Sequence, residues 1–452
     1  MKFAVIGSGP CGSLAALLLL QAGHQVELFD VDSDESLDPD GLTSKLKLVG
    51  SSSAPYDIQQ ILQVTKSGAA YGIYRSKSMG GFSNVWGATW GAQPSLEGFD
   101  WLEHHGSVTQ LLLEDGYLGE KSNTFCDCFH TFTGRIEKLK TLRNTKVENT
   151  LLAINPSKCD CIASGLASCT HGGVWNSRNL IKRCQAFDHF SFNSGKDVVK
   201  IEKIDSGLLV KGNSFSAHFD SVIIAAGSIG TVELLLNSLP STSSITLKDT
   251  RMAYLPLVRI GNRTKHKGGF AFSQYSINTL FGQNELASHI QLYSDPEIYK
   301  DRILGKLPKF VLSFAGPFLN LMLPHLALAI IYVDAESSPR VRFKKADNER
   351  KLIVDFLPPS FQTKGLKSKL GKVFGKLGFL PLLPILSWSN PGESYHLGAI
   401  ENDILDEFGT IREIPGLHVA GAISLPDIEP GPITHSAMAQ TSRLIKKLLT
   451  KI

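Results

Sequence analysis

Three glycines near the start of the chain, Gly7, Gly9 and Gly12, have the spacing of a loop that can bind a pyrophosphate. They follow an apolar stretch, 3–6, and precede a leucine-rich stretch, 13–21, which we expect to be a strand and a helix. Gly7 permits a tight turn, Gly9 leaves room for a phosphate, and Gly12 lets the helix lie close to the strand. The phosphates would bind free N–H groups at the positive end of the helix dipole.

An acid follows this unit at the expected place. Residues 25–29 predict a second strand, and Asp30 closes it where a ribose hydroxyl needs an acceptor. Strand, helix, strand and acid in this order predict a dinucleotide-binding β-α-β unit. FAD and NAD both use this unit, so the stretch does not choose between them. The alternative is an ordinary glycine turn in an α/β domain.

A second glycine-rich stretch contains Gly80, Gly81, Ser83, Asn84 and Trp86. Paired glycines with these side chains fit neither a regular helix nor a strand. They suit a backbone that lies against a flat ligand and offers it N–H and amide groups. The alternative is a glycine-aromatic surface loop.

Two later strands also end in glycines, at 220–227 and 417–421. Such endings again indicate a backbone packed against a nucleotide, so the nucleotide domain is built from separated pieces. Three antiparallel strands are expected at 198–204, 207–212 and 215–219. A last helix ends at Leu449, and its N-terminus directs its dipole at whatever binds there.

Composition sets the class of protein. The chain has 452 residues, 42% hydrophobic and 19% charged, which fits a globular protein with two structural regions. Its formal charge of +4 is too small and too dispersed to indicate nucleic-acid binding. Seven cysteines do not suggest a disulfide scaffold, and no secretory signal is visible, so we expect a cytoplasmic protein.

Two cysteine-rich stretches are candidate metal sites. Cys159, Cys161 and Cys169 lie near His171, and Cys126 and Cys128 form another C-x-C pair. The spacing fits no standard zinc finger, so structural loops are expected and no metal is predicted.

The middle of the chain has a different pattern. Region 246–394 predicts a mostly antiparallel sheet that forms a substrate floor, with strands at 253–260, 289–293, 326–333, 340–343 and 352–356. In the apolar stretch 310–331, prolines argue against a spanning helix. Residues 365–386 alternate lysine with apolar residues, which suits a helix on an anionic membrane or a lid over an apolar substrate; the alternative is buried loops.

Elsewhere, residues 58–64 predict a short helix, and residues 105–155 predict helix and loop.

Four pieces in order resemble the glucose-methanol-choline (GMC) family of FAD-dependent alcohol oxidases and dehydrogenases. They are the first glycine motif, the stretch 80–87, the stretch 225–231, and Tyr395-His396-Leu397-Gly398. The resemblance implies FAD and the oxidation of a hydroxyl to a carbonyl by hydride transfer to flavin N5. It implies an α/β fold in which an FAD-binding Rossmann-like domain, 1–245 and 395–452, combines a parallel sheet with a small antiparallel sheet. A mostly antiparallel α+β substrate domain, 246–394, completes it.

The resemblance also implies site residues. His396 falls on the family's first catalytic histidine, which can accept the hydroxyl proton. The N-terminus of the last helix can stabilise the reduced flavin. Val198 or Val199 would lie at the adenine end. The expected cofactor-binding residues are Gly7, Gly9, Pro10, Gly12, Asp30, Gly80, Gly81, Ser83, Asn84, Val199, Ala226, Gly227, Gly421, Ala422 and Thr434.

The sequence departs from the family pattern at two places. The family usually has a second His or Asn just before the last helix, where this chain has Gly431 or Pro432. His435 lies a few residues later and is the candidate substitute. Gly421 stands where members often have Asp.

The first function expected is therefore FAD-dependent oxidation of a sugar, a lipid-linked glycan or another amphipathic alcohol, by a protein in peripheral contact with the inner face of the membrane. The electron acceptor stays open. The alternatives are a flavoprotein of this fold with reductase or non-redox chemistry, and a non-catalytic nucleotide-binding partner at the membrane.

Overall fold

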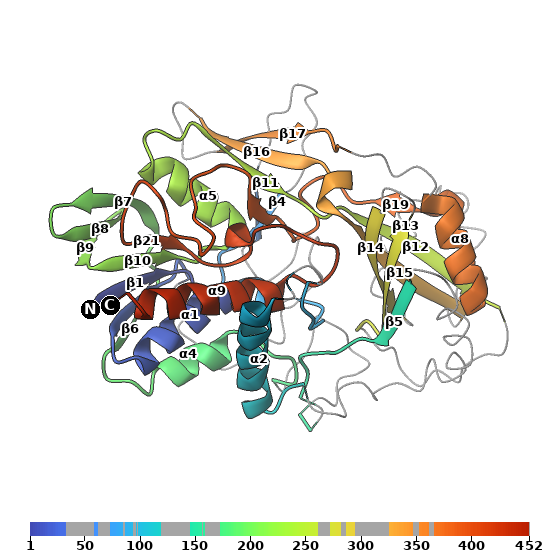
Figure 1. The fold of residues 1–452 in the computed structure, drawn as a ribbon, viewed down its shortest axis with the longest axis horizontal. Helices are drawn as coiled ribbons and strands as arrows, with labels where there is room; N and C mark the ends of the chain where they lie inside the picture. Colours follow the sequence, from blue (N-terminus) through green and yellow to red (C-terminus); the bar gives the residue numbers. More distant parts are fainter. Residues whose placement is uncertain are drawn as a thin grey trace.

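The computed structural model describes most of the chain (Figure 1). The described residues are 1–32, 58–61, 73–84, 86–93, 96, 98–118, 145–155, 157–158, 172–260, 272–281, 286–293, 325–346, 352–360 and 366–451. Both C-x-C pairs, Cys169, His171 and the stretch 310–324 lie outside these residues.

A parallel sheet of five strands holds the two halves of the sequence together. Its order is β21 (Leu417–Val419), β10 (Ser221–Ile224), β1 (Lys2–Ile6), β2 (Gln25–Phe29) and β6 (Phe190–Asn193). Strands buried on both faces read as continuous apolar runs, and 3–6 and 222–224 are such runs. The first and last segments of the chain therefore meet in one sheet.

Helices and a small sheet cover the two faces of this parallel sheet. Phe3 and Val5 pack with α1 (Pro10–Gln21), α4 (Arg178–Cys184) and α9 (Thr434–Leu449). Ala4 and Ile6 point the other way, toward α5 (Gly227–Ser238) and the antiparallel strands β7 (Val198–Ile204), β8 (Gly207–Gly212) and β9 (Ser216–Phe219). Helix α2 (Phe99–Glu114) packs outside α9.

A seven-stranded antiparallel sheet lies at the other end of the molecule (Figure 1). Its strands are β18 (Phe379–Pro381), β12 (Met252–Arg259), β15 (Leu326–Val333), β14 (Leu286–Tyr293), β13 (Tyr275–Phe281) and β5 (Thr145–Asn149), with β19 (Ser387–Trp388) paired to β12. Helix α8 (Leu366–Leu377) covers one face through Leu370 and Phe374. Tyr254, Tyr293 and Tyr332 lie on the opposite face, toward the parallel sheet.

Smaller sheets and turns connect these parts. A four-stranded sheet has the order β17 (Leu352–Leu357), β16 (Arg340–Lys345), β11 (Ser244–Lys248) and β20 (Gly398–Ile400). Strands β3 (Ile58–Ile61) and β4 (Ile73–Ser76) form a pair. The short 3-10 turns are η2 (Gly81–Asn84), η7 (Ala335–Ser337), η8 (Leu383–Ile385) and η9 (Ala422–Ser424).

The predicted fold class is confirmed: a parallel sheet with a small antiparallel sheet, joined to a mostly antiparallel region. Two local predictions are wrong. The helix expected at 58–64 is strand β3 over its described part, because Ile58 and Ile61 pair with β4. The stretch 105–155 also contains strand β5, which long-range pairing with β13 stabilises.

The division into 1–245 with 395–452 and 246–394 stays a prediction. Strand β5 from the first range joins the seven-stranded sheet, and β16 from the second range pairs with β11. No helix among the described residues is both long and apolar enough to cross a membrane.

Candidate active site

A cavity opens at the carboxyl ends of the parallel strands. Its lining includes the segments that follow β1, β10 and β21, namely 7–11, 225–230 and 420–423. Ligands in open α/β sheets bind at this edge, because the loops there are free to surround them. Lining residues from 75–78, 81–83, 196–198 and 433–437 complete the wall.

The phosphate loop has the space that its glycines predict. A Cβ added at Gly9 or at Gly227 would meet no atom within 4 Å, so both positions border open space in the cavity. Helix α1 starts after Gly9 with no side-chain cap and no acid in its first turn. Its first N–H groups therefore remain available to an anion. Gly12 is outside the lining; a Cβ there would lie 1.9 Å from the Gly7 carbonyl oxygen, which confirms close packing of helix on strand.

Asp30 lines the cavity and holds the phosphate loop in place through a hydrogen bond to Ser8. One carboxylate oxygen accepts the Ser8 N–H at 2.9 Å and the other accepts the Asp32 N–H at 3.0 Å. Burial raises the pKa of this carboxyl, although its hydrogen bonds act against that shift. The Ser8 side chain also hydrogen-bonds Asp30, and the carboxylate, with about four acceptor positions, can still accept a ribose hydroxyl.

Three basic side chains that the sequence alone does not indicate also line the cavity. Arg75, Lys77 and Lys196 all border the cavity. Arg75 is ion-paired with Glu233, another lining residue. No local motif marks these residues, because β4 and the turn before β7 are brought to the phosphate loop only by folding.

Loop 78–84 is fastened to the phosphate loop by buried hydroxyls. The Gly80 N–H donates to Ser8 Oγ at 2.9 Å, and Ser177 Oγ donates to the Ser8 carbonyl at 3.0 Å. Gly81 and Ser83 line the cavity, whereas Gly80 and Asn84 do not. The Asn84 amide instead donates to the carbonyls of Met79 and Gly81, at 2.8 and 3.1 Å, and so holds the turn.

The C-terminal segment forms the opposite wall of the cavity. Gly421 and Ala422 line it, as does Thr434, where α9 begins. Trp86, Phe82 and Tyr395 line the same part, and the Phe82 and Tyr395 rings meet edge to face at 5.4 Å. At the other end Val198 lines the cavity and Val199 does not, because successive residues of a strand face opposite ways.

His396 lies between two lining residues, Tyr395 and Leu397, but is not itself among the residues that border this cavity. Its Nδ1 is 3.1 Å from Thr250 Oγ1, and its ring stacks on Tyr332 with centroids 4.9 Å apart. Its backbone N–H donates to Ser394 Oγ at 2.9 Å, and Ser394 in turn donates to the buried Asp249. Burial lowers the pKa of His396 to about 4, so the imidazole is neutral at neutral pH.

His435 lies elsewhere, between α9 and α2. Its ring stacks on Trp90 at 4.4 Å, and its Nε2 is 3.0 Å from the His105 carbonyl oxygen and 3.1 Å from Thr109 Oγ1. Its described side-chain contacts include neither His396 nor a residue that lines the cavity. Its neighbour Thr434, on the same helix, does line the cavity. The structure thus does not bring the two predicted histidines together.

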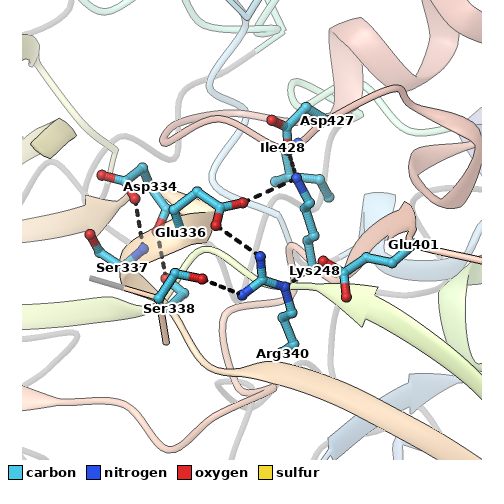
Figure 2. A network of polar contacts seen from close by, with 10 residues as sticks. Lys248, Asp334, Glu336, Ser337, Ser338, Arg340, Glu401, Asp427 and Ile428 are labelled. Carbon is cyan, nitrogen blue, oxygen red and sulfur yellow. Dashed lines mark hydrogen bonds and ion pairs between the residues drawn. The ribbon is translucent and has the colours of Figure 1, made fainter. Parts of the chain in front are cut away.

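A network of charges holds the loop that leads into α9 (Figure 2). Lys248 Nζ lies 2.9 Å from Asp427 and 3.3 Å from Glu336. Arg340 pairs with Glu336 at 2.8 Å and also with Glu401. Because β11, β16 and the residues after β20 all contribute, the network fixes the start of segment 427–433 against the four-stranded sheet.

These observations fit a dinucleotide. The open spaces at Gly9 and Gly227, the uncapped helix α1, the cations and Asp30 match phosphates and a ribose, while glycines and aromatic rings at the other end match a flat ring system. For a metal, no group of three or more suitable side chains occurs within the described ranges.

Among the comparisons with known proteins, only that with solved structures finds a match. No family model matches the chain, and no curated protein matches it either. Among solved structures, the chain is similar to pyridoxine 4-oxidase from Mesorbium loti, a GMC oxidoreductase. The two are 14% identical, the match covers 99% of this chain and 98% of that one, and the TM-score is 0.59. The chain therefore has the fold of a GMC oxidoreductase, which confirms the resemblance at the level of the fold.

Proposed function

We propose that this protein is an FAD-dependent oxidoreductase that acts on the CH–OH group of an alcohol. The observation that carries the proposal is the single cavity that joins the phosphate loop to an aromatic wall beside His396. The phosphate loop contributes Gly7, Gly9 and Pro10 to its lining, and the aromatic side chains come from Phe82, Trp86 and Tyr395. FAD, which has both a pyrophosphate and a large flat ring, matches the whole cavity better than a ligand with only one of these parts.

When bound, the flavin supplies the hydride acceptor, and the protein must orient the alcohol and handle its proton. His396 is the proposed proton acceptor. It is neutral, since burial lowers its pKa to about 4, and Thr250 holds its Nδ1 side. Thr434 places the positive end of the α9 dipole at the cavity, where negative charge is favoured.

The proposed substrate is an amphipathic alcohol. The face of the seven-stranded sheet on which Tyr332 stacks with His396 also carries Tyr254, Tyr293 and buried Gln291. A Cβ added at Gly87 would lie 3.8 Å from the Tyr293 hydroxyl, so this face approaches the loop that carries Trp86. An aromatic alcohol fits such a face; the neighbour in fold is named for pyridoxine, which is an alcohol of this kind. Sugars and lipid-linked glycans belong in the same screen.

The test is anaerobic reduction of the bound flavin. We expect the purified protein to show the absorbance of oxidised flavin, and we expect one member of a panel of benzylic alcohols, pyridoxine, aliphatic alcohols and sugars to bleach it. A protein without flavin would contradict the cofactor. Bound flavin that no alcohol bleaches would favour reductase or non-redox chemistry instead. Adding oxygen or a quinone after bleaching identifies the electron acceptor.

We expect His396→Ala to keep flavin bound and to slow bleaching by about 10²- to 10⁴-fold, the usual range for loss of a general base. Flavin content and rate are measured on the same sample by stopped-flow absorbance. An unchanged rate would remove His396 from the reaction.

We also propose a peripheral contact with an anionic membrane. In α8, Leu370 and Phe374 are buried against the sheet, so its exposed lysines Lys367, Lys372 and Lys376 face outward. Beside them Leu380 and Ile260 are 54% and 58% exposed. We expect the protein to sediment with phosphatidylserine vesicles, not with neutral ones, and the charge reversal of the three lysines to abolish this. Equal binding to both vesicle types, or none, would contradict the contact.

A further inference from the structure

One buried imidazole has no role so far. His289, on β14, is 5% exposed, and its Nε2 is a buried nitrogen without a hydrogen-bond partner. Leaving a buried acceptor unpaired is unfavourable, so such an atom marks a place where a ligand can donate a hydrogen bond.

The tautomer of His289 is set by its neighbour on β13. Its Nδ1 lies 2.7 Å from Asn278 Oδ1, which only accepts hydrogen bonds, so Nδ1 carries the proton. Burial, together with the nearby His396, lowers the pKa of His289 to about 3, so the ring stays neutral. Its Nε2 is therefore an acceptor at every working pH.

His289 lies beside Gly431, in the segment that leads into α9, although its strand β14 belongs to the seven-stranded sheet. A Cβ added at Gly431 would lie 3.1 Å from the His289 ring, so the imidazole fills the space that this glycine leaves. The Tyr332 ring lies 6.2 Å from that of His289 and 4.9 Å from that of His396, by centroids. The two imidazoles are thus neighbours around one tyrosine.

The titratable groups that face His289 are few. Tyr332 on β15 has its pKa raised by burial, and His396 is neutral; Asn278 and Gly431 carry no charge. Neutral surroundings suit a neutral donor on the ligand, such as a hydroxyl, rather than a cation.

We propose that His289 is a specificity-determining residue, whose Nε2 accepts a hydrogen bond from a second O–H group of the substrate, next to the carbinol held by His396. This rests on the proposed function and narrows its substrate class. An alcohol with a neighbouring hydroxyl, such as an ortho-hydroxybenzylic alcohol, satisfies both imidazoles. Benzyl alcohol leaves Nε2 of His289 unpaired and binds more weakly.

The test uses a matched pair of ligands. We expect the wild-type holoenzyme to bind 2-hydroxybenzaldehyde at least about fivefold more tightly than benzaldehyde, since benzaldehyde leaves the buried acceptor unpaired. Dissociation constants come from perturbation of the flavin spectrum, which needs no turnover. Anaerobic bleaching by the two corresponding alcohols should show the same preference in kcat/KM.

The preference should disappear in His289→Leu, in which both ligands bind alike. Asn278→Leu, which leaves His289 in place but releases its Nδ1, is the second variant and should weaken the preference. His418→Leu is the matched control: His418 is also buried, on β21, with its pKa lowered to about 4, and its Nδ1 contacts Thr410. It should lose stability and keep the preference.

The outcomes separate the two proposals. No preference in the wild type, or an unchanged preference in His289→Leu, overturns the role of His289 and leaves alcohol oxidation standing. Failure of every alcohol to bleach the flavin overturns the proposed function, while the aldehyde pair still decides whether His289 accepts a hydroxyl.

Discussion

Gly7 and Gly9 are two residues apart, yet they differ in backbone conformation and in the space around them. Gly7 has φ of +101°, and a Cβ there would lie 2.5 Å from the Ala225 carbonyl oxygen. Gly9 has φ of −63°, which any residue adopts, and faces open space. The fold requires the first glycine, whereas the second has no such requirement and, in the proposed function, leaves room for the phosphates.

A pair of alanine substitutions follows from this contrast. Gly9→Ala should change the free energy of unfolding of the flavin-free protein by no more than about 0.5 kcal/mol, and yet lower flavin content sharply. Gly7→Ala should cost at least about 1 kcal/mol in the same urea titration, because its backbone conformation and its contact both oppose a side chain. Full flavin retention in Gly9→Ala would show that no phosphate lies against this position.

At the scale of elements, the cavity depends on loops from distant parts of the chain being fastened together. Ser177, just before α4, is fully buried; its Oγ donates to the Ser8 carbonyl at 3.0 Å and lies 3.2 Å from the Gly80 carbonyl oxygen. Its own N–H donates to Ser83 Oγ at 3.1 Å. One hydroxyl thus joins the phosphate loop to the loop expected at the flavin ring.

Ser177→Ala should therefore lower the free energy of unfolding by about 1–3 kcal/mol, since it removes the hydroxyl that donates to the buried Ser8 carbonyl, and should weaken flavin binding. Ser107→Ala is the matched control, because Ser107 Oγ contacts only the Glu103 carbonyl on the exposed side of α2. It should stay within about 0.5 kcal/mol. Urea titration and flavin release during dialysis measure both effects, and equal behaviour of the two variants would refute the fastening role.

Across the whole molecule, buried histidines make the fold sensitive to acid. Burial lowers the pKa of His105, His396, His418 and His435 to about 4, and of His289 to about 3, against about 6.5 in an unfolded chain. Below pH 6.5 the unfolded state therefore binds more protons than the folded one. The contribution of these groups is complete above pH 6.5 and is lost as the pH falls toward 4.

Each histidine with a pKa of about 4 can contribute about 3 kcal/mol at most, and His289 about 5 kcal/mol, against a total stability of about 5–15 kcal/mol for a typical protein. Buried Asp30 and Asp249, whose pKa values are raised, act in the opposite sense but are fewer. We expect the urea midpoint to fall steadily between pH 6.5 and 4. His418→Leu should make that slope shallower, and a midpoint independent of pH in this range would contradict the linkage.

The sequence by itself determined those parts of the site whose residues lie close together along the chain. The unit from β1 to Asp30 is specified by local spacing, because a strand, a turn and a helix close in sequence must also be close in space. The strands that end at Gly227 and Gly421 are predicted for the same reason, because each strand and its glycine are adjacent in the sequence. Most of the predicted cofactor residues accordingly line the cavity, and Gly12 has the packing role expected of it.

Only the tertiary structure decided which distant side chains meet. The local pattern of 58–64 predicts a helix, but residues 58–61 form a strand because they pair with β4. His435 is near Gly431 in sequence but packs against α2, whereas His289, far away in sequence, contacts Gly431 because β14 is brought there. Neighbours along a chain constrain backbone conformation, but the partner of a side chain is set by long-range packing, which no local spacing encodes.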